Sequence, residues 1–249
     1  MSSKSDLMDL RLMSCGVGYD ASSVLLRIND WTLTAGKIHV VFGANGSGKS
    51  TLLKSLMGIQ PLLKGTMTMG ERPWRGVAGR SFDVQSMSWA SSTPPRQVGL
   101  TVEEVLAMSG NAERAGQWLP MLPDLMHQRL SDLSDGQAQQ VMIARAMLQT
   151  ESWLILDEPT AFMDIQSTGK VWALVGAHAK AGGSVVLSTH DLHGLTQWLQ
   201  SEQGGTLSSR VSFWCIHEGG TWAIPVRSDA TALEHCLLSG GETDWQGPY

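Results

Sequence analysis

Short apolar runs alternate with amphipathic stretches along much of the chain. Ile38–Phe42 is largely apolar, as is typical of a strand buried on both faces of a parallel sheet. A glycine-rich loop follows it, and then a helical pattern from about Lys49 to Met57. Two further runs of this kind, Trp153–Leu156 and Ser184–Leu187, are separated by a predicted helix over Ile165–Lys180. Strands that alternate with helices predict an α/β fold built on a parallel sheet.

The N-terminal part of the chain is richer in strand patterns than in helical ones. Asn29 and Asp30 lie between two apolar runs and predict a hairpin turn there. The strands predicted outside the alternating region are Leu10–Met13, Val24–Ile28, Trp31–Leu33, Thr66–Met69 and Met87–Ala90.

The middle of the chain has a different character. After the loop Ser91–Pro95 the pattern is helical to about Leu148, and Thr101 followed by two glutamates is a typical helix start. We therefore expect one domain of 249 residues. In it, residues 1–90 and 149–249 would form the α/β core, and residues 91–148 would form a helical insertion.

Composition excludes several classes of protein. The net charge of −5 and the isoelectric point near 5.8 leave no basic surface for neutralising nucleic-acid phosphates, so we expect no nucleic-acid partner. The sequence contains no apolar run of about 18 residues, which is the length that a helix needs to span a bilayer. Met1–Leu12 has no apolar stretch of signal-peptide type. Cys15, Cys215 and Cys236 fit neither a disulfide framework nor a metal knuckle, and we expect buried, reduced thiols. The scattered tryptophans indicate packing rather than an aromatic site.

A phosphate-binding loop follows the strand at Ile38–Phe42. Its backbone N–H groups can form an anion nest at a helix N-terminus, because glycine allows the tight turns that such a nest needs. Lys49 can reach the β- and γ-phosphates of ATP, the Ser50 hydroxyl can bind Mg²⁺, and Thr51 can reach the α-phosphate. A chance glycine loop is the alternative, but the strand before it and the helix after it oppose that. The residues that match G-x-x-x-x-G-K-[ST] are Gly43, Ala44, Asn45, Gly46, Ser47, Gly48, Lys49 and Ser50.

Two acids, Asp157 and Glu158, end the apolar strand at Trp153–Leu156. The carboxyl end of a parallel strand lies where ligands gather in such sheets. Asp157 suits holding a Mg²⁺-bound water, and Glu158 suits polarising the attacking water as a general base. The alternative is that both acids cap the turn before Pro159.

His190 follows the strand at Ser184–Leu187 and could hydrogen-bond a γ-phosphate oxygen. A lone histidine is usually structural, so this assignment depends on the phosphate loop and the two acids. No role is predicted for the other histidines, which are His39, His127, His178, His193, His217 and His235.

Leu133-Ser134-Asp135-Gly136-Gln137 opens a helix. Together with the motifs above, from about Tyr19 to Leu192, it resembles the ATP-binding-cassette ATPases, whose signature is usually L-S-G-G-Q. The resemblance implies a P-loop NTPase (RecA-like) core with a parallel sheet, an N-terminal antiparallel β subdomain and an inserted helical subdomain that carries the signature. It also implies ATP and Mg²⁺ as ligands.

The resemblance further implies that two copies of the chain sandwich two nucleotides head to tail. Ser134, Gly136 and the helix N-terminus would contact the γ-phosphate held by the second copy. Asp135 and Gln137 belong to the same signature, and Asp164 resembles the acid of the loop that links the two active sites. That loop reads Ala161-Phe162-Met163-Asp164 here instead of the common S-A-L-D.

Two further positions of the family pattern are the aromatic residue at the adenine and the glutamine at the Mg²⁺ ion. Tyr19 resembles the aromatic residue that stacks on adenine, with an ordinary surface tyrosine as the alternative. The glutamine that usually senses Mg²⁺ is absent, because Ser92 stands at its position. Gln85 lies on the wrong side of the predicted strand, and Gln97 comes too late. A water held by Ser92 could substitute.

The resemblance is greatest to bacterial importer ATPases for iron–siderophore, haem and vitamin B12 (cobalamin), on the strength of Leu133–Ala146, Leu187–Leu192 and Gly99–Val105. It implies membrane permease subunits as partners, a substrate-binding protein indirectly, and a peripheral place on the cytoplasmic face of the bacterial inner membrane. A soluble regulatory or assembly ATPase and a weakly catalytic nucleotide-binding scaffold remain alternatives. We predict a last hairpin from Arg210–Ile216 and Thr221–Pro225 around residues 218–220, and a flexible tail from Ser239 to Tyr249.

Overall fold

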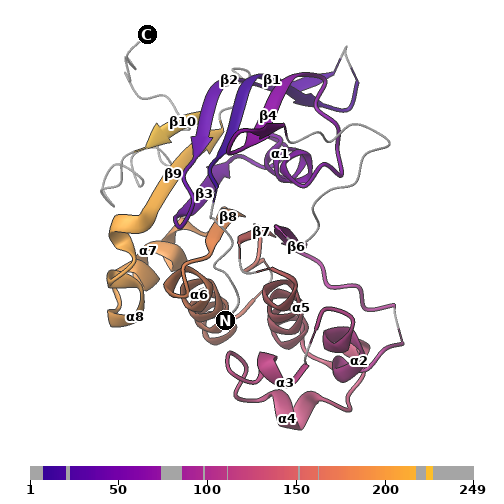
Figure 1. Ribbon diagram of the computed structural model, residues 1–249. Helices are drawn as coiled ribbons and strands as arrows, with labels where there is room; N and C mark the ends of the chain where they lie inside the picture. The colour runs from indigo at the N-terminus through magenta and orange to yellow at the C-terminus, as the bar shows by residue number, and fades with distance from the viewer. Residues whose placement is uncertain are drawn as a thin grey trace.

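The computed structural model describes residues 8–20, 23–73, 86–97, 99–110, 112–150, 152–161, 163–216 and 223–226. Two sheets lie against each other, with the helix at Lys49–Leu56 between them and further helices on the far side of the larger sheet (Figure 1). A mostly parallel sheet, a separate antiparallel sheet and a helical stretch between β6 (Met87–Ala90) and β7 (Trp153–Asp157) form the arrangement that the sequence predicts. Among the described residues, no helix combines the length and the apolar character needed to cross a bilayer.

The larger sheet has the strand order β10-β9-β3-β8-β7-β6. All neighbouring strands pair in parallel except β9 and β10, which are antiparallel. Adjacent residues of one strand pack on opposite faces, as Val185 and Val186 do, so the apolar runs reflect burial on both sides. The strands are β3 (Ile38–Gly43), β6 (Met87–Ala90), β7 (Trp153–Asp157), β8 (Ser184–Ser188), β9 (Val211–Ile216) and β10 (Ala223–Val226).

The smaller sheet is antiparallel and has the order β2-β1-β4-β5. Its strands are β1 (Leu10–Gly18), β2 (Val24–Leu33), β4 (Lys64–Met69) and β5 (Arg72–Pro73). The predicted hairpin at Asn29 and Asp30 is wrong. β2 pairs with β1 on both sides of these residues, from Leu33 opposite Leu10 to Leu26 opposite Val17, and the register shifts only after Val17. Asn29 and Asp30 are two neighbouring exposed positions that interrupt the alternation of burial but not the strand.

Helices follow the predicted alternation closely in the core. The predicted helix at Ile165–Lys180 is confirmed, and the one after the phosphate loop ends one residue earlier than expected. Between β6 and β7 the chain is helical, as predicted, but two of its helices are single turns. The helices are α1 (Lys49–Leu56), α2 (Val102–Ala107), α3 (Ala112–Ala115), α4 (Leu122–Leu125), α5 (Asp135–Gln149), α6 (Ile165–Lys180), α7 (Leu192–Gln200) and α8 (Glu202–Gly205).

Helices α2, α3 and α4 lie together at the end of the molecule away from the smaller sheet, beside one end of α5 (Figure 1). The helix start predicted at Thr101 is confirmed. Its hydroxyl accepts the Glu104 N–H, and the Glu104 carboxylate accepts the Thr101 N–H, which is a complete capping box.

Buried tryptophans pack on both faces of the larger sheet, and Trp31, Trp153 and Trp214 lie between the two sheets. Trp31 packs edge-on against Trp214, and Trp153 stacks on His39. The His39 Nε2 donates to the Thr34 carbonyl at 2.9 Å, and its Nδ1 accepts the Trp214 indole N–H at 3.3 Å. Burial lowers the pKa of His39 to about 4, because a charged imidazole would be poorly solvated there.

Cys15 is buried as predicted, and Cys215 is half-buried. The last two strands, β9 and β10, pair as predicted. The turn predicted at residues 218–220, Cys236 and the tail from Ser239 to Tyr249 lie outside the described residues.

Candidate active site

The phosphate loop connects β3 to α1 in the described structure. Gly46 and Gly48 have φ angles of 81° and 100°, in the left-handed region that glycine occupies without strain. Gly48 is the N-cap residue of α1, and no side chain caps this helix end. The first N–H groups of α1 are therefore available to an anion, and the helix dipole favours one there.

Lys49 lies at the start of α1 with its side chain only 6% exposed. Its Nζ donates to the carbonyls of Gly43 and Ala44 at 2.9 and 3.1 Å, and it lies 3.6 Å from the Glu158 Oε1. The Ser47 hydroxyl beside it is buried and has no hydrogen-bond partner among the described residues. A buried ammonium and an unpartnered buried hydroxyl at a helix N-terminus fit a polyphosphate.

Asp157, the last residue of β7, is linked to the phosphate loop and to the next strand of the sheet. Its Oδ1 accepts the Ser50 hydroxyl at 3.0 Å and the Ser188 hydroxyl at 2.7 Å. A carboxylate beside a hydroxyl is the kind of oxygen donor set that Mg²⁺ prefers, so these residues fit a magnesium ion. In the described part of the chain, no group of three His, Cys, Asp or Glu residues forms a separate metal site.

Glu158 has an unusual backbone conformation, with φ at 46° although it is not glycine. Its N–H donates to the Ser188 hydroxyl at 2.9 Å, which helps to hold this conformation. The side chain, 15% exposed, lies between two basic groups: Oε1 lies near Lys49, and Oε2 is 2.7 Å from the His190 Nδ1. Strained backbone at a cluster of charged side chains is typical of active sites.

Ser188 is a residue of this site that the sequence interpretation missed. It is fully buried at the end of β8 and contacts both acids, through its bonds to Asp157 and to the Glu158 N–H. The available signal was its position as the polar last residue of an apolar parallel strand, directly before Thr189 and His190.

Tyr19 lies beside the phosphate loop. Its hydroxyl is 3.3 Å from the Thr51 Oγ1, while the residue is 66% exposed. An exposed aromatic ring next to the loop has the surface needed to stack on a nucleobase.

The signature residues form the N-terminus of α5. Ser134 is the N-cap residue, and it forms a reciprocal capping box with Gln137 at 3.2 and 2.9 Å. Gly136 packs against Ser167 of α6, where an added Cβ would be 2.5 Å from the Ser167 Oγ. Ser167 also donates to Asp164, the N-cap residue of α6, from its N–H at 2.8 Å and its hydroxyl at 2.9 Å. These hydrogen bonds lower the pKa of Asp164.

The structure thus brings Asp164 next to the signature through Ser167. Within the described residues, no hydrogen bond or ion pair joins Ser134–Gln137 to the phosphate loop at Gly43–Ser50. One chain therefore presents two separate groups of site residues.

Ser92 is half-buried and, in the described structure, makes no hydrogen bond to Ser50 or Asp157. Its neighbour Ser91 instead accepts the Gln139 side-chain amide at 2.9 Å through its carbonyl. Gln97 is exposed, and Gln85 and Phe162 lie outside the described residues.

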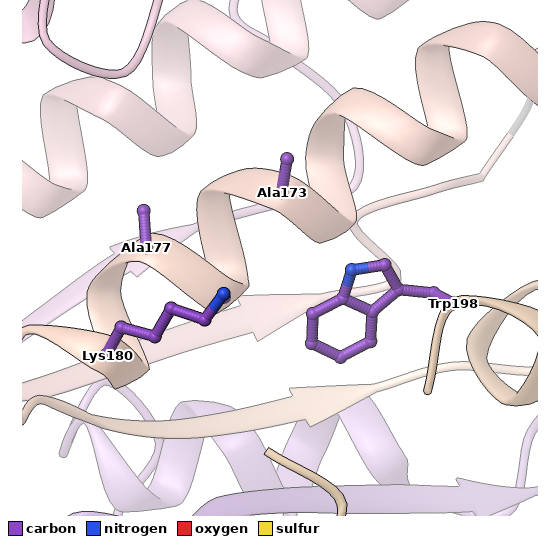
Figure 2. Close-up of a pocket in the computed structure, with 5 residues that line it drawn as sticks. Ala173, Ala177, Lys180 and Trp198 are labelled. Atoms are coloured by element: carbon purple, nitrogen blue, oxygen red, sulfur yellow. The ribbon is translucent and has the colours of Figure 1, made fainter. Parts of the chain in front are cut away.

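A hollow of about 150 Å³ lies between α6 and α7 (Figure 2). Its walls are largely apolar, and Lys180 and Trp198 face each other across it. No residue of the phosphate loop lines it. The lining residues are Ala173, Gly176, Ala177, Lys180 and Trp198.

A family model and individual relatives with known names indicate the same family for this chain. The model of the family described as ABC transporter matches residues 26–161. A zinc import ATP-binding protein of Halorhodospira halophila is 32% identical over 191 residues, which are 74% of this chain and 68% of the relative. One from Magnetococcus marinus is 34% identical over 166 residues, 66% of this chain and 61% of the relative.

A phosphonates import ATP-binding protein of Trichormus variabilis is 34% identical over 182 residues, 63% of this chain and 72% of the relative. The matched region thus spans between 61 and 72% of the length of these three relatives.

Solved structures share the fold. A nucleotide-free ATP-binding cassette from an ABC transporter superposes with a TM-score of 0.73 at 18% identity, covering 94% of this chain and 96% of the other. An inward-facing transporter described as of metal-chelate type superposes with a TM-score of 0.68 at 21% identity, covering 94% of this chain and 88% of the other.

Proposed function

The chain belongs to the ABC transporter family of ATP-binding ATPases, and on that premise we propose that two copies of it hydrolyse Mg-ATP to energise import through a membrane permease. The observation that carries the catalytic part is a cluster in which two neighbouring loop residues contact two neighbouring acids. Lys49 lies 3.6 Å from Glu158, and Ser50 donates to Asp157 at 3.0 Å. Phosphate binding, metal binding and water activation are the three tasks of ATP hydrolysis, and this cluster has a group for each.

Phosphate and metal binding would divide between the loop and the first acid. The N–H groups of α1, with Lys49 and Ser47, would hold the β- and γ-phosphates. Ser50 and Asp157 would hold Mg²⁺, directly or through its water. The metal would neutralise charge that develops on the phosphate oxygens. The role first given to Ser92 stays a prediction, and its lack of contact with this pair leaves it with no support beyond its position in the sequence.

Glu158 is proposed as the general base. Its carboxylate is positioned by His190 and lies close to the ammonium of Lys49, so it points toward the region that a γ-phosphate would occupy. It would take a proton from the attacking water as that oxygen approaches phosphorus. His190 would then have two contacts, one to Glu158 and one to the γ-phosphate.

A second copy is proposed to complete the site. Ser134, Gly136 and the N-terminus of α5 form a helix end suited to a phosphate, yet the described structure keeps it apart from its own phosphate loop. A head-to-tail dimer would bring each signature to the nucleotide of the other copy. Asp164 would link the two sites. We propose that the chain divides into a core, residues 1–90 and 149–249, and a helical part, residues 91–148. The phosphate loop and the two acids then belong to the core, and the signature belongs to the helical part.

The transport role is proposed from the relatives. Three of them are named as import ATP-binding proteins, two for zinc and one for phosphonates. We propose a metal-containing cargo, an iron–siderophore, haem or cobalamin, delivered by a substrate-binding protein to permease subunits. The metal-chelate transporter that shares the fold accords with this cargo class. The ATPase would sit peripherally on the cytoplasmic face of the bacterial inner membrane.

A detergent pull-down tests the transport role. The tagged Glu158→Gln chain is incubated with Mg-ATP and membranes, and Lys49→Ala serves as the control that should not hold ATP. We expect a polytopic permease to co-elute in stoichiometric amount with the first chain only. A nucleotide-bound dimer without any membrane protein would favour the soluble regulatory or assembly ATPase. Turnover of the natural chain at background level, measured separately with the permease present, would favour a nucleotide-binding scaffold.

A further inference from the structure

Arg96 holds the N-terminus of α5 from outside the helix. Its Nη1 donates to the Leu133 carbonyl at 2.6 Å and to the Ser131 carbonyl at 3.3 Å. Its Nη2 forms an ion pair with the carboxylate of Asp135, the first residue of the helix. One guanidinium thus binds both the backbone before Ser134 and the charged side chain after it.

Asp135 poses an electrostatic problem for the proposed function. A carboxylate in the first turn of a helix is favoured by the helix dipole when no other anion is near. If the same helix end must take the γ-phosphate of a second copy, two anions compete for it and repel each other. The usual signature avoids this because it has an uncharged glycine at this position.

We propose that Arg96 is a positioning residue for the signature, a role that rests on the proposed function. It neutralises Asp135, keeps that carboxylate engaged, and fixes the backbone that leads into Ser134. The helix end then accepts the phosphate of the other copy although it carries an acid.

A second contact supports this role. Arg96 belongs to the segment between β6 and α2, and the buried Gln139 of α5 binds the Ser91 carbonyl of the same segment at 2.9 Å. The segment is therefore tied to α5 at two places, so a shift of the segment moves the phosphate-facing helix end with it. Lysine would keep the charge at position 96 but could not make the forked contacts of a guanidinium.

The test is a double-mutant cycle on ATP-dependent dimerisation. All chains carry Glu158→Gln, and dimer dissociation constants are measured by sedimentation velocity in Mg-ATP. The Arg96–Asp135 contact lies within one chain, so its loss acts on dimerisation through the Asp135 charge, which then repels the phosphate of the other copy. At a water-exposed site this repulsion costs about fivefold per site, and a two-fold dimer contains the site twice. We therefore expect Arg96→Ala to raise the dissociation constant about 25-fold. The dissociation constant of Arg96→Lys should lie between that of Arg96→Ala and that of the reference chain, which carries Glu158→Gln alone.

The second arm removes the acid. In an Asp135→Gly background, the further change Arg96→Ala should cost less than about threefold, because no carboxylate is left to neutralise. Arg129→Ala is the matched control, since Arg129 is an exposed arginine two residues before Ser131 and its side chain has no hydrogen bond or ion pair among the described residues. ATP affinity of each monomer, measured at dilution, should not change with Arg96.

Each outcome decides the matter. Equal dimerisation of the Arg96→Ala and reference chains would overturn the role of Arg96, and so would an equal loss in the presence and absence of Asp135. A reference chain that binds ATP but stays monomeric would overturn the proposed dimer and this inference together.

Discussion

Buried His39 makes a prediction about stability and pH. Its pKa is lowered from 6.5 to about 4 by burial between Trp153 and Trp214, with the nearby Lys37 also lowering it, and the bond to the Thr34 carbonyl and the nearby Asp9 acting in the opposite direction. The unfolded chain therefore binds a proton at this histidine more readily than the folded chain does. The stabilisation is complete above pH 6.5 and is lost as the pH falls toward 4.

The magnitude follows from the difference between the two pKa values. The whole shift corresponds to about 3 kcal/mol, and about 2 kcal/mol of it should be lost between pH 7.5 and pH 5. His39→Gln keeps a donor and an acceptor but cannot take up a proton in this range. It should be less stable than the natural chain at pH 7.5, and the gap should narrow by about 2 kcal/mol at pH 5.

Urea unfolding followed by far-ultraviolet circular dichroism measures both free energies across pH 5 to 8. Fluorescence is unsuitable because Trp153 and Trp214 contact the histidine itself. The other histidines and the carboxylates are common to both chains and cancel in the difference. If the free energies of unfolding of the natural chain and of His39→Gln differ by the same amount at every pH in this range, the pKa of His39 is not lowered by folding.

Three further predictions concern the site. Lys49→Ala should weaken ATP binding at least tenfold, because a charge-assisted contact to phosphate is lost; calorimetric titration that gives an unchanged affinity would remove Lys49 from the site. Ser188→Ala should lower kcat by roughly tenfold with little change in ATP affinity, since it removes the hydroxyl that bonds both Asp157 and the Glu158 N–H; steady-state assays with equal kcat would contradict this. Gly136→Ala should destabilise the fold by about 1–3 kcal/mol through contact with Ser167, and Ser167→Ala should relieve part of that loss in thermal melts.

Much of the core could be predicted because its signals are local. The apolar runs at Ile38–Phe42, Trp153–Leu156 and Ser184–Leu187 correspond to strands buried on both faces. The hairpin at Asn29 failed because pairing with β1 along the whole of β2 outweighs a local turn signal. β1 ends at Gly18 and β2 begins at Val24.

In the site too, residues in local motifs could be predicted and residues that act through distant contacts could not. The phosphate loop and the two acids form contiguous motifs, so the sequence alone indicates them. Ser188 and Arg96 act through residues far from them in sequence: Ser188 through Asp157, and Arg96 through Leu133 and Asp135. No spacing rule predicts such contacts, because they depend on how β7 lies beside β8 and how the segment after β6 crosses the start of α5.

We propose that ATP is hydrolysed between two copies of this chain, with Glu158 as the base. The most direct test combines light scattering with nucleotide extraction on purified Glu158→Gln in Mg-ATP. We expect Glu158→Gln to form a dimer that holds two unhydrolysed ATP molecules, while the natural chain turns ATP over and returns to monomer. A Glu158→Gln chain that stays monomeric, or one that hydrolyses ATP as fast as the natural chain, would contradict it.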